Sequence, residues 1–282
     1  MKQLTPLQPV DYLIIGHITI DLISGEKRLG GTTVYSALTA QALGFKVGIV
    51  TSWGSEVPPG PLANLPIINY PSEQSTTFEN LYFESSRKQI LHHVAPSLDY
   101  YHIPETWRNA PIVHLAPVAQ EVEPSIVRNF PNSMLGVTPQ GWMRAWDDQG
   151  RVHPVEWPEA RFVLERSAAA VISLHDIEGD ENRMEEMAAY CRVLAVTNGA
   201  SGVNLFWNGD VRRFSAPVVN EVDPTGAGDI FATAFFTRLF TTRDPWEASR
   251  FATEIASISV TRPGLSGIPT PEEITNCLVE VF

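Results

Sequence analysis

One short segment of the chain, residues 223–229 (Asp-Pro-Thr-Gly-Ala-Gly-Asp), has the residue types to bind an anion and to accept a proton beside it. The apolar run at 230–240 indicates that a helix begins near its two glycines. A helix N-terminus has unpaired N–H groups and a partial positive charge, and glycine lets an anion approach that backbone closely. The carboxylate of Asp229 follows on the first turn. This pattern suits phosphoryl transfer onto a hydroxyl, although a tight loop capped by Asp229 would have the same residues.

Composition narrows the classes of function. The chain has 282 residues, 44% of them apolar, which is enough for one large core. A formal net charge of −12 argues against nucleic-acid or anionic-membrane partners. The two cysteines, Cys191 and Cys277, form neither a metal-binding motif nor a disulfide framework. We find no signal-peptide pattern and no membrane-spanning apolar run, so we expect a cytoplasmic protein.

Short apolar runs alternate with helical patterns along most of the chain. This alternation predicts an α/β fold with a mainly parallel sheet covered on both faces. An Asn-Gly turn at 208–209 predicts a hairpin between 205–207 and 211–214. The expected strands are 12–16, 46–51, 112–115, 134–137, 170–174 and 193–197; the expected helices are 32–43, 123–130, 159–167, 181–190, 245–260 and 271–281.

A less regular region lies between the second and third expected strands of the sheet. Residues 54–73 are rich in Pro and Gly, and we expect them and the linker 100–109 to be irregular. The β-prone runs 76–83 and 87–94, joined by a polar turn, predict a hairpin that could form a flap over the site.

Further candidate residues lie near the expected ends of strands. Asp21 comes just after the first strand, and Gly30-Gly31 precede a helix of small residues. The turn 197–202 (Thr-Asn-Gly-Ala-Ser-Gly) ends another strand. Ligands of open α/β sheets bind at the carboxyl ends of the strands, so these segments could converge with 223–229. Simple packing would explain the glycine pairs equally well.

The motifs of several other enzyme classes are absent from the sequence. It contains no GxxxxGK[ST], no GxGxxG after a strand, no HExxH and no GxSxG. These absences disfavour a P-loop enzyme, a Rossmann dehydrogenase, a zinc protease and an α/β-hydrolase.

Taken together, these segments resemble the ribokinase-like (phosphofructokinase-B type) carbohydrate kinases. Residues 223–229 match the C-terminal signature of that family, Gly30-Gly31 its N-terminal signature, and 196–202 its nucleotide-phosphate turn, in consistent order from about residue 11 to 275. Segments 76–79, 197–199 and 222–229 are most similar to the myo-inositol kinases within it.

The resemblance implies a fold, a reaction and a set of site residues. It implies one three-layer α/β/α kinase domain over 1–282, with a β lid inserted at about 70–108. It implies ATP, Mg²⁺ and a monovalent cation such as K⁺, a small polyol or sugar as acceptor, and a monomer or homodimer. The implied roles are a base (Asp229) with an anion cradle (Gly226, Ala227, Gly228), substrate binding (Asp21, Gly30, Gly31, Thr33, Gln140), nucleotide binding (Thr197, Asn198, Gly199, Gly202, Thr225), Mg²⁺ (Glu178) and the monovalent cation (Asp223).

The sequence departs from the family pattern in two places. The family's Asn-x-x-Glu, which helps to organise Mg²⁺, corresponds to 175–178 (His-Asp-Ile-Glu), so the Glu is present and the Asn is not. Thr138 stands where many relatives have Asp, and Gln140 and Arg144 after it could contact substrate or phosphate or could equally be structural.

Two other functions fit the same residues. A nucleoside kinase of this fold would need an aromatic slot, which Phe78, Tyr82 and Phe83 could supply. A non-catalytic sugar- or nucleotide-sensing protein is the second alternative, and retention of Asp229 and the motif glycines argues against it.

Overall fold

The computed structural model describes residues 7–23, 25–54, 56–83 and 86–278. Its centre is a nine-stranded sheet in the order β15-β14-β13-β12-β9-β8-β1-β4-β5. Every pairing in this sheet is parallel except β13–β14 and β14–β15. Its strands are β1 (Tyr12–Ile15), β4 (Val47–Trp53), β5 (Ile67–Pro71), β8 (Ile112–Leu115), β9 (Met134–Val137), β12 (Ala169–Ser173), β13 (Val193–Thr197), β14 (Val203–Trp207) and β15 (Asp210–Phe214).

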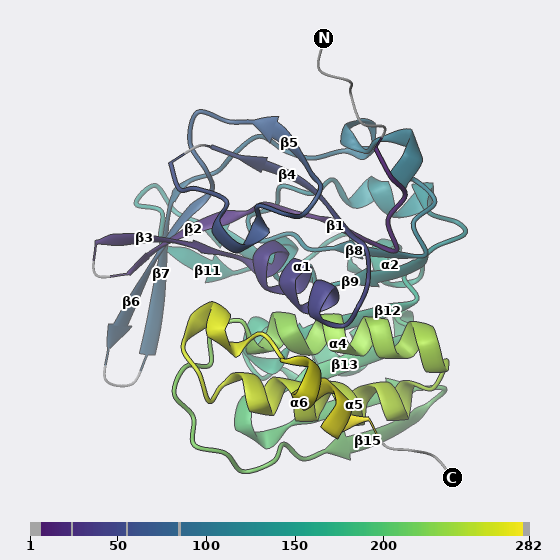
Figure 1. The fold of residues 1–282 in the computed structure, drawn as a ribbon. Coiled ribbons are helices and arrows are strands. Elements are labelled where there is room, and N and C mark those ends of the chain that lie inside the picture. Colours follow the sequence, from purple (N-terminus) through teal and green to yellow (C-terminus); the bar gives the residue numbers. More distant parts are fainter. Residues whose placement is uncertain (1–6, 24, 55, 84–85, 279–282) are drawn as a thin grey trace.

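Helices cover both faces of this sheet, which confirms the predicted three-layer α/β/α class (Figure 1). One face packs against α1 (Thr32–Ala42), α4 (Ala227–Thr242) and α5 (Pro245–Ser259), followed by α6 (Pro271–Cys277). The other packs against α2 (Ala160–Leu164) and α3 (Glu181–Tyr190). The central strands are apolar runs because both of their faces are buried, and all four residues of β1 are fully buried.

A separate four-stranded sheet, β3-β2-β6-β7, contains the strands of the predicted lid, and we call this sheet the lid (Figure 1). The predicted hairpin is present as β6 (Thr77–Phe83) and β7 (Ser86–His93), which pair antiparallel. The expected insertion at 70–108 is incomplete as a description, because β2 (Thr19–Ile23) and β3 (Glu26–Gly30) belong to the same sheet. Strand β2 pairs parallel with β6, so Asp21 lies in the lid and not in a loop after the first strand.

Two regions expected to be irregular contain regular structure. Residues 54–73 include the edge strand β5, which pairs parallel with β4. Residues 100–109 include two 3-10 turns, Tyr100–His102 and Glu105–Trp107. The helix expected at 123–130 is a 3-10 helix, Pro124–Asn129, and that expected at 271–281 ends at Cys277, with 279–282 outside the described residues. Their prolines and short length weaken the hydrophobic periodicity by which such elements are recognised in a sequence.

Polar contacts fasten the lid to the core near the start of β6 and the end of β7. The buried imidazole of His17 lies 2.7 Å from the Thr76 hydroxyl and 2.9 Å from the Pro96 carbonyl oxygen. At the same end of the hairpin, the N–H of Leu91 on β7 donates to the carbonyl of Gly150 at 2.7 Å. Gly150 lies in the turn between β10 (Arg144–Trp146) and β11 (Val152–Pro154), so this hairpin holds the lid against the core.

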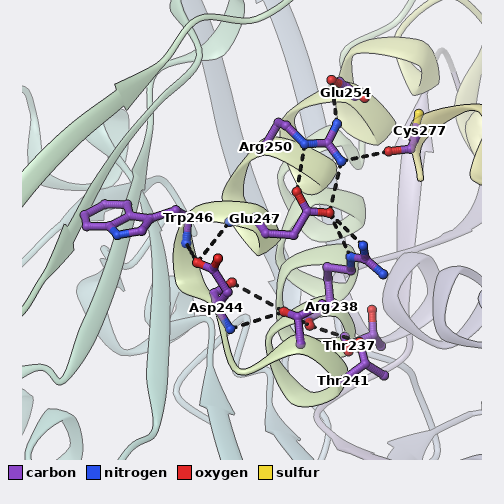
Figure 2. Close-up of polar contacts among 10 residues, drawn as sticks. Thr237, Arg238, Thr241, Asp244, Trp246, Glu247, Arg250, Glu254 and Cys277 are labelled. Carbon is purple, nitrogen blue, oxygen red and sulfur yellow. Dashed lines mark hydrogen bonds and ion pairs between the residues drawn. The ribbon is translucent and has the colours of Figure 1, made fainter. Parts of the chain in front are cut away.

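A partly buried ion network joins α4, α5 and α6 (Figure 2). The carboxylate of Glu247 accepts from Arg238 at 2.7 Å and from Arg250 at 2.8 Å. Arg250 also donates to Glu254 and to the Cys277 carbonyl, at 2.8 and 2.9 Å. Burial acts to raise the pKa of Glu247, but the hydrogen bonds from both arginines outweigh it and hold that pKa below its ordinary value of 4.5.

Replacing Glu247 with Gln should lower the free energy of unfolding by about 1–3 kcal/mol at pH 7, because Arg238 loses its carboxylate partner and Arg250 keeps only Glu254. A depressed folded-state pKa contributes stability above the unfolded value, so the deficit should shrink as the pH falls below 4.5. Urea titrations at pH 7 and pH 4 measure both effects. The matched control is Glu165→Gln, which breaks an exposed pair with Arg161 and should cost well under about 1 kcal/mol. Equal costs for the two variants would contradict the prediction.

Candidate active site

The segment 223–229 forms a turn that leads directly into α4. Gly226 is the N-cap residue with φ +79°, and a Cβ built on it would come within 2.2 Å of the Tyr35 ring on α1. Only glycine fits both constraints at this position. No side chain caps the helix in the described structure, so the interpretation of Asp229 as a capping residue is wrong. The N–H of Ala227 donates to the Pro224 carbonyl at 3.2 Å. The N–H groups that follow it on the first turn of α4 are the ones available to an anion.

The other aspartate of this segment organises the turn. The two carboxylate oxygens of Asp223 accept from the N–H groups of Thr225 and Gly264, at 2.9 and 2.8 Å. Both hydrogen bonds are internal to the protein, so this carboxylate stabilises the loop. The expected cation site near the carbonyl groups of Asp223 and Thr225 remains a prediction.

Asp229 lies on the first turn of α4 in an environment that makes its carboxyl group more basic. Burial raises its pKa to about 6, against a hydrogen bond from the Thr32 side chain and the charge of Arg144, which lower it. The charges of Asp176 and Asp21 raise it further. A carboxyl group with this pKa is mostly ionised at neutral pH and is a stronger base than an exposed aspartate.

Thr32, to which sequence reasoning assigned no role, contacts this carboxyl group, and substrate binding by Thr33 stays a prediction. Thr32 is the first residue of α1, directly after Gly31, which has φ +85°. The hydroxyl of Thr33 is fully buried, with no hydrogen-bond partner within the described part of the chain. Two consecutive threonines at a helix start are ambiguous in sequence, because only the cap geometry decides which one faces the sheet edge.

The lid contributes the carboxylate of Asp21. A Cβ on Gly30 would come within 2.1 Å of an Asp21 carboxylate oxygen, so Gly30 provides the space that this side chain occupies. A Cβ on Gly31 would come within 2.9 Å of Thr19. The two glycines thus allow β2 and the start of α1 to pack closely, with Asp21 near enough to Asp229 to influence its pKa.

A polar cluster opposite α4 contains Gln140, Arg144 and Asp176. The Gln140 side-chain amide donates to Asp176 at 2.9 Å, and an Arg144 guanidinium nitrogen lies 3.8 Å from the same oxygen. The other Asp176 oxygen accepts from the N–H of Ser173 at 3.1 Å. Sequence reasoning assigned no role to Asp176, although it occupies the family's Asn-x-x-Glu region. The feature of the sequence that could have identified Asp176 is its position, three residues after the end of β12.

A pocket of about 370 Å³ lies beside the N-terminus of α4. Ala227 and Gly228 line it, and three predicted nucleotide-binding residues, Thr197, Gly199 and Gly202, lie on its wall. The predicted Asn198 and Thr225 are not among its lining residues. Most of the remaining wall is apolar or small and was not predicted: Ala216, Pro217, Val218, Val219, Phe231, Thr253, Ala256, Ser257 and Val260.

The expected metal residue, Glu178, is exposed at the end of a 3-10 turn with φ +54°. Within the described ranges, no three His, Cys, Asp or Glu side chains are grouped so that they could hold a metal ion. Mg²⁺ that enters with a nucleotide commonly uses one or two carboxylates together with phosphate oxygens, so Glu178 stays a prediction. None of the described helices is long and apolar enough to cross a membrane.

Comparison with known proteins agrees with this geometry. Residues 159–272, which include the turn 197–202 and segment 223–229, match the pfkB family of carbohydrate kinases. A cytidine kinase of Thermococcus kodakarensis is 26% identical over 252 residues, which cover 80% of this chain and 87% of that protein.

Solved structures share the whole fold. A pyrophosphate-dependent kinase in the ribokinase family, complexed with a pyrophosphate analog and myo-inositol, aligns with a TM-score of 0.77 at 19% identity, over 95% of this chain and 100% of that one. A ribokinase of Thermotoga maritima aligns with a TM-score of 0.73 at 22% identity, over 95% and 99%. Residues 159–272 therefore resemble the pfkB family of carbohydrate kinases, and the chain as a whole has the ribokinase fold.

Proposed function

We propose that the protein transfers the γ-phosphoryl group of ATP to a hydroxyl of a small polyol or sugar, with myo-inositol or a related carbohydrate as the preferred acceptor. One observation carries the proposal: a carboxyl group with a pKa of about 6 and an uncapped helix N-terminus adjoin the same pocket wall, at Ala227 and Gly228. A base and an anion cradle side by side are what phosphoryl transfer to a hydroxyl requires.

The pocket beside Gly228 supports a nucleotide as donor. Its wall of small and apolar side chains suits the flat face of a purine, and its volume of about 370 Å³ exceeds what two phosphates need. The proposed donor, ATP, differs from the donor of the structural neighbour, which is a pyrophosphate-dependent kinase. A pyrophosphate donor would leave this apolar wall without a ligand.

In the proposed reaction the substrate oxygen bonds to the γ-phosphorus as the bond to the bridging oxygen breaks, and ADP leaves with that electron pair. The substrate proton passes to the Asp229 carboxylate. The N–H groups of Gly226, Ala227 and Gly228 stabilise the charge on the transferring group, and Arg144 adds a positive charge nearby. Asp21 and Gln140 bind acceptor hydroxyls, and the lid, with the turn at Gly30-Gly31, keeps water away from the phosphoryl group.

The remaining components of the proposal follow the resemblance. Mg²⁺ would enter with ATP and neutralise phosphate charge, with Glu178 as the protein's contribution to its surroundings. A monovalent cation would lie near the carbonyl groups of Asp223 and Thr225. The catalytic unit is one domain that spans the chain together with its lid, in the cytoplasm, as a monomer or homodimer.

A nucleoside kinase is the second candidate, because the relative from Thermococcus kodakarensis is a cytidine kinase. A nucleoside kinase needs an aromatic slot for the base of its acceptor. Phe78 does not suit this slot, because it is 5% exposed and packs against Leu91, Val118 and Ala119. The structure does not describe the side chains of the other two candidates, Tyr82 and Phe83. A polyol needs only polar partners, which Asp21 and Gln140 provide.

The decisive experiment measures product formation with ATP·Mg²⁺ or pyrophosphate·Mg²⁺ as donor and myo-inositol, ribose, fructose or cytidine as acceptor. We expect turnover with ATP and the highest kcat/KM with a polyol or sugar. Turnover with pyrophosphate alone would refute the donor assignment, and a preference for cytidine would establish the nucleoside kinase. Tight ligand binding without turnover on any pair would favour a sensor.

A further inference from the structure

A buried chain of hydrogen bonds runs beneath α4 and reaches the backbone of the proposed base. Thr138 follows β9 and is hydrogen-bonded to His114 Nε2 at 2.9 Å. His114 Nδ1 lies 2.9 Å from the hydroxyl of Tyr12, which is hydrogen-bonded to the Thr233 side chain. The Thr233 hydroxyl donates to the backbone carbonyl of Asp229 at 2.9 Å.

The direction of every hydrogen bond in this chain follows from its last link. Thr233 uses its only hydroxyl proton on the Asp229 carbonyl, so Tyr12 must donate to Thr233. Tyr12 then accepts from Nδ1–H of His114, and Nε2 accepts from Thr138. Burial lowers the pKa of His114 to about 3 and raises that of Tyr12 well above its ordinary value, so both stay neutral.

The chain connects two parts of the site. Thr138 is the N-cap of the 3-10 helix Pro139–Met143, which carries Gln140. At the other end, Asp229 lies on a first turn that has no side-chain cap. Uncapped first turns fray, because their N–H groups have no partner. The bond from Thr233 to the Asp229 carbonyl lies within α4, and the hydrogen bond between Thr233 and Tyr12 connects this first turn to β1.

We propose that the chain Thr138–His114–Tyr12–Thr233 is a positioning device that fixes Asp229 relative to the acceptor-binding turn at Gln140. All four side chains are buried, with exposures of 7% for Thr138 and 0% for the others. Loss of one link leaves a donor or acceptor unpaired in the core and frees the Asp229 peptide to shift. A shift of about 1 Å between base and acceptor is enough to cost orders of magnitude in rate.

The inference rests on the proposed function. Thr233→Val tests it, and a second variant on the same helix is the control. Thr233→Val removes the last link and keeps the side-chain shape, whereas Thr233→Ser restores the hydroxyl. The control Thr237→Val removes an equivalent buried bond one turn later, from Thr237 to the Thr233 carbonyl at 2.8 Å, outside the chain.

We expect Thr233→Val to lower kcat about tenfold or more with KM for both substrates within about twofold. Tyr12→Phe should do the same, while Thr237→Val and Thr233→Ser should stay close to wild type. Equal kcat values for Thr233→Val and Thr237→Val, or a change in KM alone, would overturn the proposal.

A second measurement is independent of activity. Backbone amide hydrogen exchange over residues 227–233 should be faster in Thr233→Val and Tyr12→Phe than in Thr237→Val, since only the first two release the start of α4. If the wild-type protein transfers no phosphoryl group to any acceptor, the proposed function is wrong and exchange alone decides whether the chain anchors this turn. Unchanged exchange in all variants would refute the anchor itself.

Discussion

Asp229→Asn is expected to lower kcat by about 10²–10⁴-fold while KM for ATP changes little. The amide has nearly the same shape but cannot accept the proton of the substrate hydroxyl. Asp229 is not among the residues that line the donor pocket, so we expect the substitution to leave its wall intact. Steady-state kinetics and ATP binding by calorimetry separate the two effects.

The wild-type rate should also depend on pH in a way that the variant does not. Asp229 must be ionised to accept a proton, and its pKa is about 6. The log of kcat/KM should therefore be level above pH 6 and fall by about one unit for each pH unit below it. Asp229→Asn should lose this acidic limb.

The matched control is Asp210→Asn, which removes an exposed carboxylate at the start of β15. It should retain wild-type kinetics and the acidic limb. Near-wild-type turnover in Asp229→Asn, or a limb that persists in it, would remove Asp229 from the role of base.

The second large effect is expected from Gly226→Ala. Its φ of +79° disfavours any side chain, and the added Cβ would come within 2.2 Å of the Tyr35 ring. Left-handed backbone costs about 1–2 kcal/mol and overpacking about 1–3 kcal/mol, so we expect a loss of about 2–5 kcal/mol in the free energy of unfolding. Turnover should fall at least about tenfold, because α1 and the anion cradle must move apart.

Two other glycines give sharp controls for Gly226→Ala. Gly209→Ala introduces the same strain at φ +80°, where a Cβ meets nothing within 4 Å, and should cost about 1–2 kcal/mol with unchanged turnover. Gly228→Ala also meets nothing within 4 Å and lies inside α4, so it should stabilise the fold by about 0.5–1 kcal/mol.

Gly228 nevertheless lines the donor pocket, and the new methyl group should raise KM for ATP. Urea denaturation and kinetics on the three variants would test this pattern together. A smaller stability loss in Gly226→Ala than in Gly209→Ala would show that the Tyr35 ring gives way and would contradict the prediction.

Local sequence predicted most of the central fold because buried parallel strands and their helices have strong, regular patterns. β1, β13 and α3 lie within a residue or two of their expected bounds. The lid was harder, since β2 pairs with β6, a strand more than fifty residues away in the chain, and no local pattern records that pairing. Strand β5 was hidden by the prolines and glycines around it.

The candidate site divides in the same way. Segment 223–229 was found because glycines and an aspartate at a helix start carry chemistry in their own types. The pocket wall on α5 had a fainter signal: Thr253, Ala256, Ser257 and Val260 recur at helical spacing as a stripe of small residues. The roles of Thr32 and Asp176 depend on distances across the sheet edge, which only the three-dimensional structure supplies.

The two-part origin of the lid limits how it can be exchanged between relatives. Strands β6 and β7 alone form an antiparallel pair, and one edge of β6 is completed only by β2. A cassette that transplants residues 70–108 into another kinase would carry that edge unpaired, or would pair it with a foreign β2 that lacks Asp21. Unpaired edges invite aggregation. Any chimaera designed to transfer acceptor preference must therefore graft Thr19–Gly30 together with the hairpin.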